Sequence, residues 1–230
     1  MLMTDIDYSE EAVTCRGFVA YDDTASGKRP GVLVFHEGLG LGEHIIERTR
    51  RVAKLGYVAL AADMFGDRRQ ARDLEDMRRL VGDLRNDPTK LRARARAALA
   101  TLGSLPQVNA TRLCAIGFCF GGSVVLELAR DGADLKAVVS FHGVLATKAP
   151  ALPGKVNASV LVLTGANDRL APPEHVTAPL KPRCARQAFG IGRSSRTATP
   201  TMPSPTLQPR GLSSRAHSTM SNRIADRGQR

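Results

Sequence analysis

The sequence predicts an α/β fold: a doubly wound, mostly parallel sheet with helices on both faces. Two observations support this class. Short apolar runs rich in β-branched residues recur up to about residue 178, and segments with helical periodicity lie between them. Continuous apolar runs are typical of strands buried on both faces of a parallel sheet. Their alternation with helices indicates βαβ units.

The expected elements follow from these patterns. Parallel strands are predicted at residues 31–35, 57–62, 112–116, 135–141 and 158–164. Helices are predicted between them, at residues 43–55, 73–84, 89–105 and 122–130. Residues 13–21 alternate in a way that predicts an additional antiparallel strand at the edge of the sheet.

Charge divides the chain into two parts. The formal net charge is +11, from 33 Lys and Arg against 22 Asp and Glu. Residues 179–230 hold ten of the basic residues and one acidic residue, Asp226, so residues 1–178 hold 23 and 21. The segment 179–230 is dense in Ser, Thr, Pro and Arg, which predicts a disordered basic tail after a domain at 1–178. Because the domain is nearly neutral, nucleic acid is not expected as a partner.

Composition also bears on location and metal binding. No apolar run approaches the roughly eighteen residues of a membrane-spanning helix, and the first residues lack the apolar stretch of a signal peptide. The spacing of the four cysteines matches neither a zinc site nor a disulfide framework. A cytoplasmic protein with reduced thiols and no metal is therefore expected.

The most informative motif is G-F-C-F-G-G, at Gly117 to Gly122. It lies directly after the strand predicted at 112–116 and before a helical run, which is the setting of the G-x-S-x-G nucleophile turn. Sulfur replaces oxygen, so Cys119 is the predicted nucleophile, and the start of the helix would stabilise its thiolate. The alternative is a buried structural cysteine, which suits Cys15 and Cys114 better.

On this motif and two others the chain resembles the dienelactone hydrolase family, which has the α/β-hydrolase fold. The family's G-x-C-x-G-G turn matches Gly117 to Gly122. Its glutamate after the first parallel strand falls on Glu37 in VLVFHEGLGLGEH, and its triad aspartate falls on Asp168 in G-A-N-D. These motifs lie between residues 30 and 175.

The resemblance implies a role for each residue. Cys119 would attack an ester or lactone carbonyl and form a thioester. The backbone N–H groups of Phe120 and Gly38 would stabilise the oxyanion. Glu37 would interact with the resting cysteine and help to generate its thiolate, and Asp168 would orient a histidine. The alternatives are an ordinary solvated carboxylate for Glu37 and a turn residue for Asp168.

The triad histidine should follow Asp168 in the chain. His175 lies too close behind Asp168 to turn back toward it, and His217 lies in the predicted disordered tail. His36 and His142 follow strands at the edge where the site is expected, so they could line the pocket but have the wrong chain position. His44 is expected on a surface helix. No histidine meets the family's pattern.

A shifted reading frame would explain this absence. Family members continue with a segment resembling H-A-F-T-D-P, which supplies the histidine, and then reach D-R-R-S-W. When codons are read from the third base, residues 202–207 permit the first segment and residues 224–228 permit the second, in family order. The hypothesis is that a slip near Ala178 replaced the family's C-terminal part. The alternative is a genuine basic tail.

The predicted function is hydrolysis of a lactone or small carboxylic ester through Cys119, without a cofactor and impaired by the missing histidine. The alternative is an inactive α/β fragment whose tail is incidental or binds polyanions. Phe120, His142 and Arg68 are the expected pocket residues from chain position. The motif specifies acyl chemistry, and it does not specify the acyl group.

Overall fold

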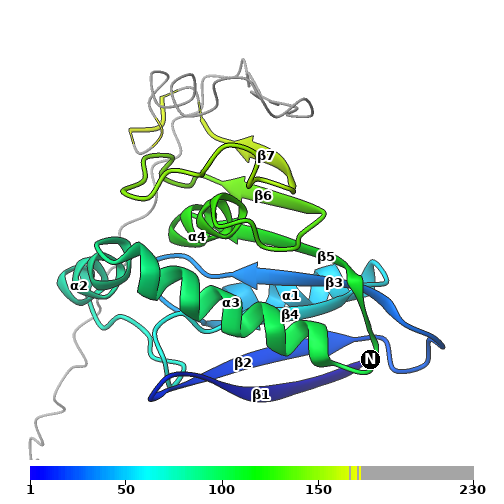
Figure 1. The fold of residues 1–230 in the computed structure, drawn as a ribbon. Helices are drawn as coiled ribbons and strands as arrows, with labels where there is room; N and C mark the ends of the chain where they lie inside the picture. Colours follow the sequence, from blue (N-terminus) through cyan, green and yellow to red (C-terminus); the bar gives the residue numbers. More distant parts are fainter. Residues whose placement is uncertain (166, 170, 172–230) are drawn as a thin grey trace, which may run out of the picture. The chain divides into compact units, whose positions relative to one another are not determined.

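A seven-stranded sheet forms the centre of the molecule, with strand order β1-β2-β4-β3-β5-β6-β7 (Figure 1). The computed structural model describes residues 1–165, 167–169 and 171. The strands are β1 (Leu2–Glu10), β2 (Val13–Tyr21), β3 (Arg29–Phe35), β4 (Val58–Ala62), β5 (Val108–Phe118), β6 (Ala137–Phe141) and β7 (Ser159–Leu163).

The predicted α/β class is confirmed. Strands β4, β3, β5, β6 and β7 are paired in parallel, as expected for the five apolar runs. Strand β2 is antiparallel as predicted, but its predicted place at the sheet edge is wrong. It lies between β1 and β4, and β1 is the edge strand. The sequence pattern did not reveal β1 because most of its side chains are exposed or half-buried and only Tyr8 is buried.

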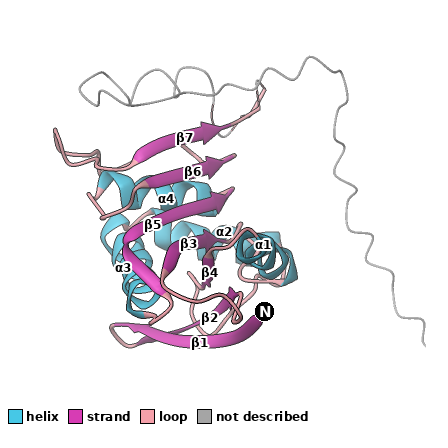
Figure 2. Cartoon of the chain, turned by 90° about the vertical axis from the view of Figure 1, so that its right-hand side faces the viewer, coloured by secondary structure: helices cyan, strands magenta, loops and turns pink. Residues whose placement is uncertain are grey.

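The helices cover the two faces unequally. They are α1 (Glu43–Lys54), α2 (Leu74–Arg85), α3 (Pro88–Ser104) and α4 (Phe120–Arg130). Figure 2 shows α1 on the opposite side of the sheet from α3 and α4. Asp73 and Asp87 cap the N-termini of α2 and α3 by accepting backbone N–H hydrogen bonds from Asp76 and Lys90. Such caps satisfy donors that the first turn leaves unpaired.

Burial follows this arrangement. Every residue of β4 is buried, because α1 packs on one face and α3 lies over the other. Strands β6 and β7 instead alternate between buried and less buried residues. Val138, Val160 and Val162 belong to the core formed with α3 and α4, whereas Val139 and Leu161 on the other face are half-buried.

The parallel strands all end at one edge of the sheet, and the residues after them form the candidate site. Glu37 follows β3, Cys119 follows β5, His142 follows β6 and Asp168 follows β7. Ligand sites in open α/β sheets gather at this carboxyl edge. The predicted domain boundary at 178, the tail 179–230, His175 and His217 lie outside the described residues.

Candidate active site

Cys119 occupies a sharp turn between β5 and α4. Its φ of 52° and ψ of −110° are strained for a residue with a side chain. The turn is held by a 2.8 Å hydrogen bond from the Cys119 N–H to the Phe141 carbonyl. A Cβ on Gly117 would lie 2.0 Å from the Gly121 carbonyl oxygen, and one on Gly121 would lie 2.4 Å from the Phe35 carbonyl oxygen. Both positions therefore require glycine.

The environment of the Cys119 sulfur is electrostatically mixed. Burial is the main cause that raises the pKa of the thiol, and the nearby carboxylates of Glu37 and Asp168 raise it further. The backbone N–H groups of Phe120 and Gly38, which face the sulfur, lower this pKa. The resting side chain is therefore a protonated thiol at neutral pH. The same two N–H groups are the predicted oxyanion donors.

The two carboxylate oxygens of Glu37 differ in their contacts. Its Oε1 lies 2.7 Å from Nδ1 of His44, whose Nε2 accepts a 3.1 Å hydrogen bond from Arg48. Its Oε2 is buried and has no hydrogen-bond partner within the part of the chain that the structure describes. A buried carboxylate oxygen in this state is costly, and such groups are concentrated at functional sites. His44 is exposed on α1 as expected, and no sequence pattern indicated its contact with Glu37.

Asp168 is almost fully buried after β7 and is held by two side chains. Thr164 donates a 2.8 Å hydrogen bond to its Oδ2. Nδ1 of His142 is hydrogen-bonded to the same oxygen. The prediction that Asp168 orients a histidine thus has a counterpart in the structure, but the histidine is His142, which precedes Asp168 in the chain.

Comparison with known proteins decides the family. The profile of the dienelactone hydrolase family matches residues 15–184 of the 230. The chain belongs to the dienelactone hydrolase family. The solved structure named m3DLH is 43% identical and superimposes with a TM-score of 0.78, covering 83% of this chain and 80% of that one. A dienelactone hydrolase-like promiscuous phosphotriesterase from metagenomic libraries is 44% identical, with a TM-score of 0.72, over 77% of this chain and 74% of its own.

Curated relatives in the same family are more distant. A Yersinia pestis protein provisionally named a carboxymethylenebutenolidase is 31% identical over 69% of this chain and 63% of its own length. A protein of the same provisional name from a Synechocystis strain is 34% identical over 55% of this chain and 53% of its own length. The matched part of this chain thus spans less than two thirds of these relatives.

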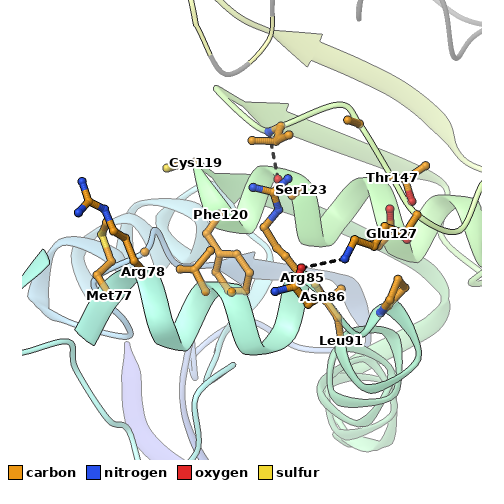
Figure 3. Close-up of a pocket in the computed structure, with 17 residues that line it drawn as sticks. Met77, Arg78, Arg85, Asn86, Leu91, Cys119, Phe120, Ser123, Glu127 and Thr147 are labelled. Carbon is orange, nitrogen blue, oxygen red and sulfur yellow. Dashed lines mark hydrogen bonds between the residues drawn. The ribbon is translucent and has the colours of Figure 1, made fainter. Parts of the chain in front are cut away.

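A cavity of about 620 Å³ opens beside Cys119 of this dienelactone hydrolase family member. Figure 3 shows Cys119, Phe120 and Ser123 at the start of α4, and Met77, Arg78 and Arg85 from α2 also line the cavity. The lining is mainly apolar, and its cationic side chains are Arg78, Arg85 and Lys148. Such a cavity accommodates a small organic molecule.

Two of the predicted pocket residues are not among the residues that line this cavity. Phe120 lines it as expected. Arg68 does not, because its guanidinium is bound to the Asp5 carboxylate at 2.6 and 3.0 Å and to the Gly17 carbonyl at 2.8 Å. His142 is turned toward Asp168 instead.

The described residues hold no group of three or more His, Cys, Asp or Glu side chains arranged to bind a metal ion. None of their helices has the length and apolar character needed to cross a bilayer. Within that part of the chain, the residues after the parallel strands remain the strongest candidate for chemistry.

Proposed function

We propose that this chain hydrolyses small carboxylic esters or lactones through a thioester on Cys119. One observation carries the proposal. A thiol in a strained strand-to-helix turn faces the backbone N–H groups of Phe120 and Gly38, which act to lower its pKa, and it lies on the wall of a cavity of about 620 Å³. When a carbonyl carbon bonds to the sulfur, those donors can turn to its oxygen, where negative charge develops.

Glu37 would accept the thiol proton in the first half of the reaction. Its buried Oε2 has no partner among the described residues, and its charge already acts on Cys119. As the sulfur attacks, the proton passes to the carboxylate and then to the departing alkoxide, so a thioester and a free alcohol result. Proton transfer by a positioned carboxylate contributes about 10²–10⁴-fold to such steps. Asp168 acts later, through the histidine that it orients.

The cavity supports a substrate with an apolar body. Met77, Val81, Leu91, Phe120 and Val144 supply apolar walls, while three cationic side chains can attract an anionic group on the substrate. The likeness to a protein named as a promiscuous phosphotriesterase adds uncharged phosphotriesters to the substrates to be measured.

We also propose that the protein works in a reducing compartment, the cytoplasm. Cys15, Cys114 and Cys119 are free thiols in the structure, and the mechanism requires at least the last to remain reduced. Disulfides form readily in exported proteins and rarely in the cytosol. Cell fractionation with an antibody to the chain would test this location.

The test of function is steady-state hydrolysis of p-nitrophenyl acetate and of a small lactone by the full chain. We expect turnover in the wild type and a loss of at least about 1,000-fold in Cys119→Ala. Cys114→Ala is the matched control, because Cys114 is five residues away on β5 and outside the cavity lining. Equal activity in Cys119→Ala and the wild type would exclude the proposal.

A further inference from the structure

The nucleophile has a potential proton acceptor on each side of it in the sheet. Strand order places β3 and β6 on opposite sides of β5. Glu37 follows β3, Cys119 follows β5 and His142 follows β6. The 2.8 Å bond from the Cys119 N–H to the Phe141 carbonyl joins the two turns directly, since His142 is the next residue. In the order of the strands across the sheet, His142 therefore lies between Cys119 and Asp168.

The two acceptors differ in their access to water. Oε2 of Glu37 is buried. The His142 side chain is 54% exposed, while its partner Asp168 is 3% exposed. A buried carboxylate can take a proton from a thiol beside it, but an attacking water molecule must enter from the open side. The open side carries the imidazole.

His142 is held as a base rather than left as a mobile surface side chain. The ionised Asp168 carboxylate can accept hydrogen bonds but cannot donate them. Nδ1 of His142 therefore carries the proton between the two groups, and Nε2 presents a lone pair. The His142 backbone has a φ of 57°, and its N–H donates a 2.8 Å hydrogen bond to the Leu163 carbonyl. A non-glycine residue fixed in this region is strained, and such strain is concentrated at functional positions.

The other described histidines have no ring nitrogen to spare. His36 is fully buried, with Nδ1 at 2.6 Å from the Glu37 carbonyl oxygen and Nε2 accepting a 3.2 Å bond from the Met64 N–H. His44 is bonded at both nitrogens, to Glu37 and Arg48. Nε2 of His142 has no hydrogen-bond partner among the described residues, so it alone of their imidazoles can accept a proton without breaking a bond.

Resting on the proposed function, we infer that His142, oriented by Asp168, is the general base of the hydrolytic half-reaction. Water attacks the thioester carbonyl while Nε2 takes one of its protons. The tetrahedral intermediate then collapses, the bond from carbon to sulfur breaks, and Nε2 returns the proton to the Cys119 thiolate. The products are the carboxylic acid and the resting thiol. The chain thereby completes turnover with a histidine that precedes the triad aspartate.

The experiment is rapid-mixing hydrolysis of p-nitrophenyl acetate by the full chain and by His142→Gly. Glycine suits a φ of 57°, so this variant keeps the turn and opens space beside Asp168. We expect its initial burst, which reports acylation of Cys119, to stay within about threefold of the wild type. Steady-state turnover should fall by about 100-fold or more, and the acyl-enzyme should accumulate.

Rescue separates a base from a structural residue. Added imidazole should raise the steady-state turnover of His142→Gly by at least about tenfold, because a free imidazole can occupy the vacated space. Cys119→Ala in the same buffer corrects for hydrolysis by imidazole itself. His175→Gln and His217→Gln are the matched controls and should keep wild-type turnover.

The outcomes divide cleanly. Wild-type steady-state turnover in His142→Gly, or a loss of turnover in His175→Gln or His217→Gln instead, would overturn the inference while leaving Cys119 as nucleophile. A wild-type chain that shows no burst and no acylated Cys119 would overturn the proposed function and this inference together.

Discussion

Asp63 and Glu37 follow adjacent parallel strands at the same edge of the sheet, yet their carboxylates have opposite surroundings. Asp63 comes after β4 and is fully buried. Its two oxygens accept four backbone N–H hydrogen bonds, from Arg16, Phe65, Gly66 and Arg68, at 2.7 to 3.0 Å. Glu37 comes after β3, and its buried Oε2 has no partner among the described residues.

This difference in hydrogen bonding distinguishes a carboxylate that stabilises the fold from one that can take part in a reaction. Every lone pair that Asp63 needs to fill is filled by backbone donors, so its charge ties β2 to the loop after β4 and leaves no lone pair open. Glu37 keeps an oxygen without a partner among the described residues, near a thiol whose pKa is raised. A saturated carboxylate stabilises the fold, whereas an unsaturated one lowers stability and can move a proton.

Among the substitutions that test this comparison, Glu37→Gln should have the largest effect on activity. The amide has nearly the same shape but cannot accept the thiol proton, so the rate of the acylation burst should fall by about 100-fold or more. Urea unfolding should show a stability close to or above that of the wild type, because a buried carboxylate oxygen without a partner among the described residues is replaced. A burst rate within threefold of the wild type would show that another group takes the proton.

Asp63→Asn is the matched substitution at the saturated carboxylate. It places an amide N–H₂ against backbone N–H donors and weakens bonds to a charged acceptor, which should lower the free energy of unfolding by about 3 kcal/mol. Urea denaturation followed by circular dichroism measures this. The burst rate of the folded fraction should change little. Unchanged stability would remove the distinction drawn between the two carboxylates.

A smaller effect is expected at His44, which fixes Oε1 of Glu37 at 2.7 Å. His44→Ala frees the carboxylate to rotate away from Cys119, so the burst rate should fall by about tenfold. His44→Gln retains a side-chain N–H that can bond to Oε1 and should recover part of the loss. Equal burst rates in His44→Ala and the wild type would mean that the loop backbone alone places Glu37.

The smallest effect concerns the Cys119 thiol. Burial raises the pKa of this thiol, and the carboxylates of Glu37 and Asp168 raise it further. Alkylation of Cys119 by iodoacetamide should therefore increase with pH into the alkaline range. Glu37→Gln removes a negative charge that raises this pKa, so its alkylation profile should move to lower pH. Cys15 is the internal control: it is fully buried with a pKa of about 11 and should remain unmodified until the chain unfolds.

Much of the scaffold could be predicted from sequence because its signals are local. Strands β3 to β7 are apolar runs buried on at least one face, and the nucleophile turn is defined by glycines that the backbone geometry requires. Strand β1 escaped because most of its side chains are exposed or half-buried, so it lacks an apolar pattern although it forms a hairpin with the neighbouring β2. Its Tyr8 hydroxyl bonds to the Asp63 backbone at 2.9 Å, a contact no local pattern reveals.

The candidate site, like the scaffold, could be predicted only where a local motif identifies a residue. Glu37, Cys119 and Asp168 each lie in a recognisable local motif, but their partners come from elsewhere in the chain. His142 follows a different strand from Asp168, and His44 reaches Glu37 across seven residues. Arg68 was expected in the pocket from its place after β4 and instead binds Asp5, which belongs to the unpredicted β1.

The most direct test of the account is to locate the acyl group after a rapid acid quench of the chain with p-nitrophenyl acetate. Trypsin releases residues 113–130 as one peptide, and fragmentation in the mass spectrometer separates Cys114 from Cys119 within it. The account predicts one acetyl group on Cys119, none on Cys114, and longer persistence of the adduct in His142→Gly. An acetyl group found elsewhere, or no adduct during active turnover, would contradict it.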